Sequence, residues 1–388
     1  MHAGAAVSTH EWSVRADLAE AAVVSRHLRR VWGIPGTLLG VVAWPPSRHE
    51  RMFLRWDYWW QAHLIDCAVD AAERSLSSAR RRRIVAVTRT HRLRNLSGWT
   101  NNYYDDMAWL GLALERAQRT AGVTRRSAIE ALEAEIYDSW APERGGGIPW
   151  RRGDDFFNTP ANGPGGILLA RTGKTSRAQD MADWIDATLV DPKSNLVLDG
   201  IHTDRPPDRQ LDRDIYTYCQ GVVLGLETEL AVRLDEPRHA RRVHRLVQAV
   251  AQELTDNGVV KGGGGGDGGL FNGILVRYLA LTAVMLPGNT ADDIRARDTA
   301  ADIVLASASA AWHNRRDVDG QPLWGRDWAQ PAALPAFGKQ LATFTGGTVH
   351  SSDIAERDYS VQLSGWMLME AACVVSAAGY RPFGSRQP

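Results

Sequence analysis

Six strongly apolar segments recur along the chain, each starting where Gly, Asn, Tyr or Phe residues gather. Successive starts are about 45 to 60 residues apart, and the last interval is about 90 residues. The segments begin near Tyr58, Tyr103, Asn162, Tyr216, Leu270 and Tyr359. Intervals of this size hold two helices and two connections, so the pattern predicts six helical pairs.

Segments with apolar residues on a single helical stripe lie between the apolar ones. The clearest are 127–140, 176–189, 237–254 and 291–312. A helix that is apolar on most faces is buried, and a helix with one apolar stripe covers it. The alternation predicts an all-α chain folded as an (α/α)6 barrel of six inner and six outer helices. An open α-solenoid is the alternative, but its repeats would share side-chain patterns. No Pro/Ser-rich linker divides the sequence, so we expect residues 1–388 to form a single domain.

Charge and composition exclude several partners. The 45 Lys and Arg residues balance 45 Asp and Glu residues, so net charge gives no single-sign field for nucleic acid or an anionic membrane. Five arginines fall between residues 74 and 83. We interpret them as a solvated face, and we expect the run 80–87 to end an outer helix, with a short strand at 84–87 as the alternative. The sequence does not indicate an oligomeric state.

Signals for a membrane span, a metal or a cofactor are weak. The most apolar early stretch, 33–46, is broken by two prolines and is shorter than the roughly 20 residues that cross a bilayer. No secretory segment opens the chain, so as written we expect a cytoplasmic protein, with action outside the cell if translation starts upstream. The three cysteines are far apart and the histidines are scattered, which predicts no disulfide, no metal site and no cofactor.

The segment 99–109 has the richest chemistry, because Asp105 and Asp106 stand side by side among aromatic residues at the start of an apolar segment. Capping of a helix start explains one aspartate, but the second would be desolvated among rings. Glycoside hydrolysis needs two carboxyl groups across one bond. Adjacent Cα atoms are about 3.8 Å apart, which favours the shorter carboxyl spacing of retaining enzymes. Because like charges this close resist joint ionisation, we expect the pKa of one member to rise.

The run NNYYDDMAWLGLALERA at 101–117 closely resembles the signature of glycoside hydrolase family 76, the endo-α-1,6-mannanases. Weaker pieces agree in order, so that the matches extend from about residue 55 to 375: YWWQAH at 58–63, RGGGIPW at 144–150, YTYCQGVVLG at 216–225 and FNGILVRYL at 271–279. The resemblance implies an (α/α)6 barrel and retaining hydrolysis of α-1,6-linked mannan, with Asp105 as nucleophile and Asp106 as general acid/base. Two residues depart from the family pattern, since many members have Asn where this chain has Cys219 and Lys where it has Asn272.

Aromatic and amide side chains near the starts of the apolar segments are the candidates for substrate binding. Fifteen of the aromatic residues are tryptophan, whose flat face and N–H donor suit stacking on sugar rings, although a tryptophan-rich core is the alternative. We expect sugar platforms among Trp99, Tyr103, Trp150, Tyr218 and Phe271. Hydrogen bonds to sugar hydroxyls are expected from Asn101, Asn102, Asn162 and Gln220, with capping or turn roles as the alternative for the asparagines.

Two further polar segments fit other roles. Asp154 and Asp155 follow two arginines, so salt pairing is expected there rather than catalysis. The glycine-rich stretch 261–269 lacks the Gly-Lys-Ser/Thr ending of a phosphate loop, and we interpret it as a flexible loop at the rim of the barrel.

Three functions are compatible with the predicted barrel. A retaining glycosidase acting on α-1,6-mannan uses the aspartate pair directly. A sugar epimerase on the same type of barrel would need inward-facing histidines, and only His63 lies within a predicted inner helix. A carbohydrate-binding protein without catalysis would not need the intact Asp105–Asp106 pair.

Overall fold

The computed structural model describes residues 7–96, 98–335, 341–345 and 347–381. Most of these residues are helical, and the strands are two or three residues long. Internal contacts divide the chain into two compact units. The terminal unit comprises residues 1–29, 40–55 and 250–388, and the central unit comprises residues 30–39 and 56–249.

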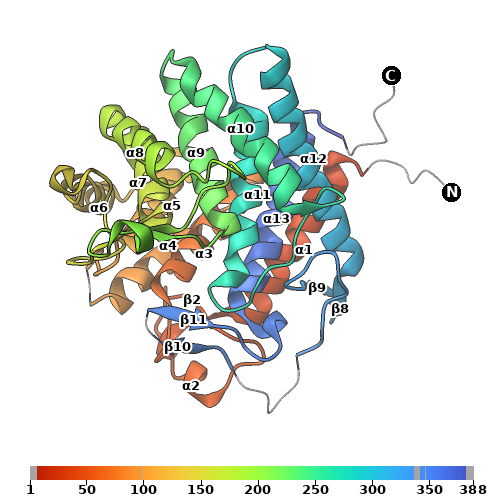
Figure 1. The fold of residues 1–388 in the computed structure, drawn as a ribbon. Helices are drawn as coiled ribbons and strands as arrows, with labels where there is room; N and C mark the ends of the chain where they lie inside the picture. The colour runs from red at the N-terminus through yellow and green to blue at the C-terminus, as the bar shows by residue number, and fades with distance from the viewer. Residues whose placement is uncertain (1–6, 97, 336–340, 346, 382–388) are drawn as a thin grey trace. The chain divides into compact units, whose positions relative to one another are not determined.

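The central unit contains a row of inner helices, each followed by an outer helix (Figure 1). The inner helices are α3 (Tyr58–Arg74), α5 (Tyr104–Ala121), α7 (Thr159–Arg171) and α9 (Thr217–Arg233). Each of them contacts the next one in the row. The outer helices are α4 (Ser78–Arg94), α6 (Arg126–Asp138), α8 (Thr175–Thr188) and α10 (Pro237–Glu253), the last of which crosses the unit boundary. Because each outer helix returns the chain, the N-terminal ends of the inner helices lie at one end of this unit.

The terminal unit has its own helical core. Helix α11 (Gly268–Met285) packs against α13 (Tyr359–Ala377), and α12 (Ala291–Asn314) covers both. Helix α1 (Thr9–His27) packs on α13, and α2 (Arg48–Arg51) is a single turn.

Strands are confined to the connections. A three-stranded antiparallel sheet in the central unit joins β3 (Phe156–Asn158), β4 (Gly200–His202) and β5 (Leu211–Asp212). Asn158 lies opposite Gly200, and Gly200 lies opposite Asp212. The remaining strands form two-stranded sheets: β1 (Leu28–Arg29) with β2 (Leu39–Gly40), β6 (Thr255–Asp256) with β7 (Val259–Val260), β8 (Arg316–Val318) with β9 (Gln321–Leu323), and β10 (Thr343–Thr345) with β11 (Thr348–His350).

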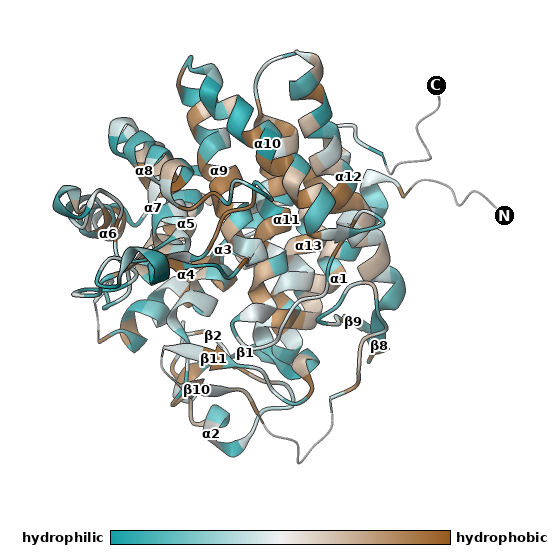
Figure 2. Cartoon of the chain, viewed as in Figure 1, coloured by the Kyte–Doolittle hydropathy of each residue, from teal (hydrophilic) through white to brown (hydrophobic). Residues whose placement is uncertain are grey.

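Burial separates inner from outer helices in the way that the apolar pattern predicted. In α7 every residue from Thr159 to Ala170 is buried. In α8 the buried residues form one stripe with helical spacing: Ala178, Met181, Ala182 and Ile185. Figure 2 shows the same contrast, with hydrophobic colours on inner helices such as α9 and hydrophilic colours on outer helices such as α8.

An amide side chain at the fourth position of an inner helix binds the connection that precedes it, an arrangement that we name the amide clamp. In α7 the Asn162 Oδ1 accepts a hydrogen bond from the N–H of Ile148 at 2.9 Å. Its Nδ2 donates to the carbonyls of Ile148 and Asn158, both at 2.8 Å. In α9, Gln220 makes the same pair of bonds to the N–H and carbonyl of Val197, both at 2.8 Å. The clamp thus satisfies buried backbone groups of an irregular segment.

The clamp recurs in other inner helices. Gln362 in α13 accepts from the N–H of Trp324 at 3.1 Å and donates to its carbonyl at 2.9 Å. Gln61 in α3 donates to the carbonyl of Trp56 at 3.0 Å. Helix α5 departs from the pattern, because its fourth residue is Met107. Its start carries the aspartate pair instead.

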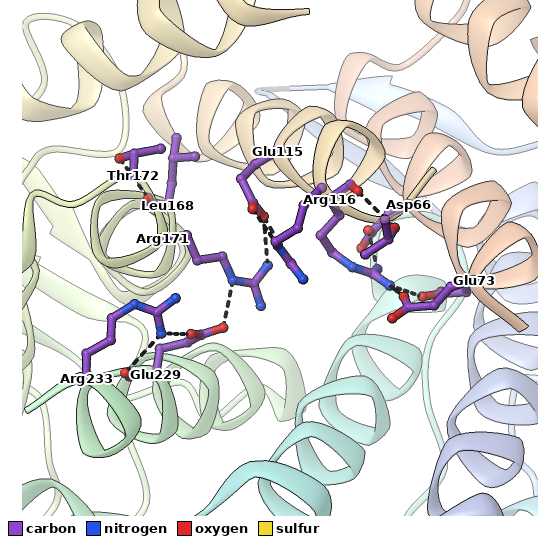
Figure 3. Close-up of polar contacts among 12 residues, drawn as sticks. Asp66, Glu73, Glu115, Arg116, Leu168, Arg171, Thr172, Glu229 and Arg233 are labelled. Carbon is purple, nitrogen blue, oxygen red and sulfur yellow. Dashed lines mark hydrogen bonds and ion pairs between the residues drawn. The ribbon is translucent and has the colours of Figure 1, made fainter. Parts of the chain in front are cut away.

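Charged side chains join the C-terminal halves of the inner helices of the central unit (Figure 3). Arg116 on α5 pairs with three acids of α3, namely Asp66, Asp70 at 2.6 Å and Glu73 at 3.2 Å. Burial by itself lowers the pKa of Arg116, but Asp70 and Glu73 outweigh burial and raise it. The guanidinium therefore stays charged inside the unit.

A second charged chain lies in the neighbouring helices. Arg171 on α7 donates to Glu229 on α9 at 2.7 Å and lies 3.7 Å from Glu115 on α5. Burial raises the pKa of Glu229, but Arg171 and Arg233 outweigh burial and lower it. Cations at the C-terminal ends of helices also offset the negative ends of their dipoles.

The predicted helices are confirmed. The starts of the six inner helices lie within about three residues of the predicted ones, and the outer helices α6, α8, α10 and α12 cover the predicted amphipathic segments. Residues 84–87 belong to α4, so the strand alternative is wrong; the run 80–87 lies in the first half of this outer helix, which continues to Arg94, and does not end it. The periodicity did not predict α1.

The glycine-rich stretch 261–269 is packed, which corrects the prediction of a flexible loop. The N–H of Gly266 donates to Asp358 Oδ2 at 2.7 Å, and Asp267 Oδ2 accepts from the N–H of Val349 at 2.7 Å. A Cβ atom at Gly266 would lie 2.1 Å from the carbonyl oxygen of Val349. Glycine is required here because other segments of the terminal unit approach its backbone this closely.

Among the described residues, one helix, α11, is long and apolar enough to cross a membrane. The share of its length buried inside the protein is 67%. The core helix of a globular unit meets the same criteria.

Candidate active site

The two aspartates lie in the first turn of α5, and an asparagine in the preceding loop contacts one of them. Asn101 Oδ1 accepts a hydrogen bond from the N–H of Tyr103 at 2.8 Å, which orients the amide. Asn101 Nδ2 then donates to Asp106 Oδ2 at 2.5 Å. The carboxylate of Asp106 is therefore held against the loop that leads into the helix.

Asp105 has different partners. Its Oδ1 accepts from the N–H of Asp106 at 2.8 Å, one of the first-turn N–H groups that have no acceptor within the helix. Its Oδ2 accepts from the indole Nε1–H of Trp150 at 3.0 Å, and Trp150 comes from a different connection. Capping accounts for only one carboxylate oxygen of the pair, and each aspartate has its own side-chain donor.

Backbone pairing brings Trp150 to the start of α5. The N–H of Tyr104 donates to the carbonyl of Trp150 at 2.9 Å, and the N–H of Trp150 donates to the carbonyl of Phe156 at 2.8 Å. Tyr103 also pairs in antiparallel fashion with Arg151. The aspartate pair, the indole donor and β3 thus belong to one hydrogen-bonded unit.

A glycine turn directs the chain toward Trp150. Gly145, Gly146 and Gly147 all have positive φ, of 87°, 102° and 82°. A Cβ atom at Gly147 would lie 2.7 Å from the ring of Trp184, and one at Gly146 would lie 3.0 Å from the ring of Trp140. The glycines therefore allow a left-handed turn in close contact with two tryptophans, whose role here is packing.

Aromatic rings flank the aspartate pair. The rings of Tyr103 and Trp150 meet edge to face with centroids 5.2 Å apart, and Phe156 lies 6.5 Å beyond Trp150. Trp99, Tyr103 and Trp150 are all partly exposed. They combine a solvent-accessible face with a fixed position, as a sugar platform requires.

A buried tyrosine lies on the other side of the loop. The hydroxyl of Tyr58, the first residue of α3, donates to the carbonyl of Trp99. Burial, followed by the charge of Asp106, raises the pKa of Tyr58. Its ring packs edge to face on His91 at 4.2 Å. Tyr58 therefore stays neutral and supports the loop beside Asp106.

Asp199 is a third carboxyl group whose pKa responds to the charge of Asp105, and no sequence motif pointed to it. Its N–H donates to the carbonyl of Asp214 at 2.9 Å, and its carbonyl accepts from the N–H of Thr159 at 2.7 Å. Burial raises its pKa to about 7, with further contributions from Asp212, Asp214 and Asp105. The sequence does contain one signal for Asp199, because it directly follows the apolar run 196–198, whose residues are buried in the structure.

The two departures from the family pattern lie beneath the surface. Cys219 is buried, and its Sγ donates to Asp199 Oδ1 at 3.9 Å. Burial, followed by the charge of Asp199, raises the pKa of this thiol. Asn272 is buried in α11 of the terminal unit, where its Nδ2 donates to the carbonyl of Lys261 at 2.9 Å. Cys219 thus affects the protonation of Asp199 through its hydrogen bond, and Asn272 contributes to the packing of the terminal unit.

The other predicted substrate-binding residues occupy varied positions. Asn162 and Gln220 are completely buried and form amide clamps, so their positions fit a structural role. Asn102 is exposed, and its carbonyl accepts from the N–H of Arg152. Tyr218 is partly exposed in the first turn of α9, and Phe271 is partly exposed in α11 of the terminal unit.

Replacing Asp199 by asparagine is expected to stabilise the protein at high pH only. The pKa of Asp199 is raised from 3.8 to about 7 in the folded protein. Between these two pH values the folded chain therefore keeps a proton that the unfolded chain loses. The free energy of unfolding therefore falls as the pH rises from about 4 to 7, and this loss is fully present above pH 7. The asparagine of the variant cannot ionise, so we expect a Tm gain of about 2 to 4 °C at pH 8 and none at pH 4.

Thermal unfolding of wild type and variant at the two pH values tests this expectation. Asp208→Asn is the matched control, because Asp208 is an exposed aspartate in the same connection, which precedes α9. A Tm difference between wild type and Asp199→Asn that is the same at both pH values would contradict a partly buried, proton-binding Asp199.

No group of three or more His, Cys, Asp or Glu side chains in the described part of the chain is arranged to hold a metal ion.

Comparison with known proteins identifies the family. The model of glycosyl hydrolase family 76 matches residues 18–361, most of the chain. This chain belongs to glycosyl hydrolase family 76. No curated protein sequence matches the family 76 chain.

Solved structures similar to the family 76 chain include mannanases. An α-1,6-mannanase of this family from a Salegentibacter species is 27% identical, with a TM-score of 0.78 over 94% of this chain and 99% of that one. An inactive variant of that enzyme, with two consecutive aspartates replaced by asparagine, is in complex with α-1,6-mannotriose; it is 26% identical at the same TM-score and coverage. A protein from Listeria innocua is 27% identical, with a TM-score of 0.75 over 93% of this chain and 96% of that one.

These similarities confirm the fold class and the type of enzyme. The family 76 chain is all-α, and its structural neighbours are (α/α)6 barrels, as the six-fold alternation predicted. The chain is accordingly a glycoside hydrolase. The single domain expected over residues 1–388 stays a prediction.

Proposed function

We propose that this glycoside hydrolase cleaves α-1,6-mannosidic linkages with retention of anomeric configuration. One observation carries the proposal: two adjacent carboxylates stand at the start of α5, each with its own side-chain donor, beside the partly exposed rings of Trp99, Tyr103 and Trp150. The α-1,6-mannanase from Salegentibacter supports the linkage.

The position of the pair is supported by elimination. The Salegentibacter variant with two consecutive aspartates replaced is inactive. Consecutive aspartates occur at three places in this chain, 105–106, 154–155 and 292–293. Asp154 and Asp155 form the expected salt bridges with Arg151 at 2.7 Å and Arg144 at 2.5 Å. The pair 292–293 lies in the first turn of the outer helix α12, where Asp293 completes a capping box.

In the proposed reaction Asp105 is the nucleophile. Its ionised carboxylate attacks the anomeric carbon while Asp106, protonated, donates its proton to the glycosidic oxygen. The bond between the anomeric carbon and that oxygen breaks, and a glycosyl ester forms on Asp105. In the second step Asp106, now ionised, takes a proton from water, and the resulting hydroxide displaces Asp105. The two inversions leave the product with the configuration of the substrate.

The neighbouring donors fit these roles. The Trp150 N–H donates to the oxygen of Asp105 that is not used for capping, which stabilises the ionised nucleophile. Asn101 donates to Asp106, which favours the ionised form needed in the second step. The adjacent charge of Asp105 favours the protonated form of Asp106 before the first step, and this charge is neutralised when the ester forms.

The stereochemical course tests the proposal. A proton NMR time course of α-1,6-mannotetraose hydrolysis should show the α-anomer first, followed by slow mutarotation. Initial appearance of the β-anomer would contradict the retaining mechanism, and absence of cleavage of this substrate would contradict the linkage.

Replacing Trp150 by phenylalanine is expected to lower kcat by about 10- to 100-fold, because it removes the donor to Asp105 and keeps an aromatic ring. Steady-state kinetics on the same oligosaccharide measure the effect. Trp184→Phe is the matched control, since Trp184 packs on Gly147 and should leave kcat within about threefold of wild type. An equal loss in both variants would assign Trp150 to packing alone.

A further inference from the structure

Residues 75–104 form a strongly basic stretch. They include seven arginines and no aspartate or glutamate. Because the whole chain is neutral, the remaining residues carry an equal negative excess. Charge is therefore segregated along the chain, and a local positive field exists although the total is zero.

All seven arginines lie on α4, which has one buried and one exposed side. The helix buries Ile84, Val87 and His91. Its exposed stripe follows the helical spacing of three and four residues and consists of Arg82, Val85, Arg89 and Leu93. Arginines and large apolar side chains thus alternate on one solvent-facing stripe.

The exposure of the apolar members is substantial. The exposed fractions are 39% for Val85 and 47% for Leu93. Leu96, just after the helix ends, is 96% exposed with a positive φ of 51°. Apolar side chains held in water are unfavourable in the free protein, and contact with another apolar surface would bury them.

A neighbouring turn adds two more apolar residues. The 3₁₀ turn η1 (Val31–Gly33) is tied to α4, because Arg94 lies 5.3 Å above the Trp32 ring and the N–H of Leu38 donates to Thr90 Oγ1 at 2.8 Å. The exposed fraction of Trp32 is 60%. All tryptophans of the chain lie in the described residues, and Trp32 is the only exposed one. Ile34 follows with 41% exposed.

We infer that this surface, the α4 face (Arg82, Val85, Arg89, Leu93, Leu96, Trp32 and Ile34), binds an anionic lipid bilayer. Arginines would contact lipid phosphates, and the leucines, Ile34 and the indole would enter the boundary between headgroups and acyl chains. Tryptophan is favoured at that depth. A nucleic acid would use the arginines but would leave Leu93, Leu96 and Ile34 in water.

The α4 face adjoins the loop that leads to the aspartate pair. Arg92 of α4 lies 5.5 Å from the ring of Trp99, which begins that loop. Bilayer binding would therefore bring the loop near the membrane, where a glycan carried on a lipid is concentrated. This consequence rests on the proposed function, whereas binding to the bilayer does not.

Vesicle co-sedimentation of the full chain tests the inference. Vesicles of equal parts phosphatidylglycerol and phosphatidylcholine should bind the protein at low salt, and pure phosphatidylcholine vesicles should bind it at least tenfold less. Arg82→Gln/Arg89→Gln should lower the partition coefficient about 30-fold, because each arginine near an anionic surface contributes roughly a fivefold change. Leu93→Ser/Leu96→Ser should lower it at least fivefold. High salt should weaken binding by the wild type.

Arg205→Gln/Arg209→Gln is the matched control, since both are exposed arginines in a loop where aspartates alternate with them. It should bind vesicles like the wild type, and circular dichroism should show that all variants fold. Absence of binding to anionic vesicles at low salt would overturn the inference. The inference would also be overturned if the α4 variants bound vesicles as well as the wild type does. It would be overturned too if the protein bound heparin but no vesicles, and Arg82→Gln/Arg89→Gln weakened the binding to heparin. All of these outcomes are read without any hydrolysis assay.

Discussion

Asp105→Asn is expected to reduce kcat on α-1,6-mannotetraose by about 10⁴-fold or more, because no other group replaces the attacking carboxylate. The asparagine side chain has nearly the same shape as the aspartate, and its amide oxygen can still accept from the Trp150 N–H. Substrate binding should therefore persist. Initial rates give kcat, and calorimetric titration with the oligosaccharide gives Kd.

Asp155→Asn provides the matched control for this prediction. It makes the same chemical change in a second aspartate pair, at a residue that is partly exposed and bonded to Arg144. Its kcat should stay within about twofold of the wild type, since ion pairs at the surface contribute little. An Asp105→Asn variant with near-normal kcat would contradict the assignment of the nucleophile.

Asp106→Asn is expected to slow hydrolysis to an extent that depends on the leaving group of the substrate. Without a proton donor, hydrolysis of unactivated mannosides should fall by about 10²- to 10⁴-fold. An aryl mannoside whose phenolate leaves without protonation should form the glycosyl ester at a nearly normal rate. A pre-steady-state burst of phenolate followed by slow turnover would show this, since the ester would wait for a base to activate water.

The burst distinguishes Asp106 from Asp105 in the same assay. Asp105→Asn forms no ester and should show no burst with the aryl substrate. Equal losses on both substrate types in Asp106→Asn would show that Asp106 has a role other than acid/base catalysis.

Much of the fold was predictable because the inner helices are apolar on nearly all faces. Burial of such a helix requires neighbours all round, so the alternation with amphipathic segments indicates concentric layers. The residues of α7 illustrate this, since their glycines and Pro164 argue against a helix locally while their uniform burial maintains one. The loop at 261–269 was misjudged because glycine signals either freedom or close contact, and only the position of Val349 and Asp358 decides between them.

The site was predictable only in part, for a related reason. Asp105 and Asp106 are adjacent in sequence, so their proximity needs no tertiary information. Asp199, whose pKa the charge of Asp105 helps to raise, lies in an irregular connection, which has no periodicity to place it. Asn162 and Gln220 were predicted as sugar ligands and bind backbone in the structure, because an amide at a helix start has the same sequence signature in both roles.

The summed charge was misleading in another way. A net charge of zero averages the basic stretch 75–104 with acidic residues elsewhere, so it does not describe any one surface. The arginines at 74–83 were interpreted as a solvated face, and Arg81 and Arg82 are exposed on α4, whereas Arg74 belongs to α3. The alternation of the α4 arginines with exposed apolar residues becomes visible only when Trp32 and Ile34 are brought beside them.

The amide clamp has a consequence for how such a protein changes during evolution. Asn162, Gln220 and Gln362 each fix the point where a connection reaches its inner helix, by two or three hydrogen bonds to that connection. Residues earlier in a connection can then lengthen or diverge without shifting the helix start. The longest connection, between α12 and α13, is anchored in this way at Trp324. The loops can therefore diverge while the starts of α7, α9 and α13 keep their positions, and loop exchange between relatives is a rational route to new specificities.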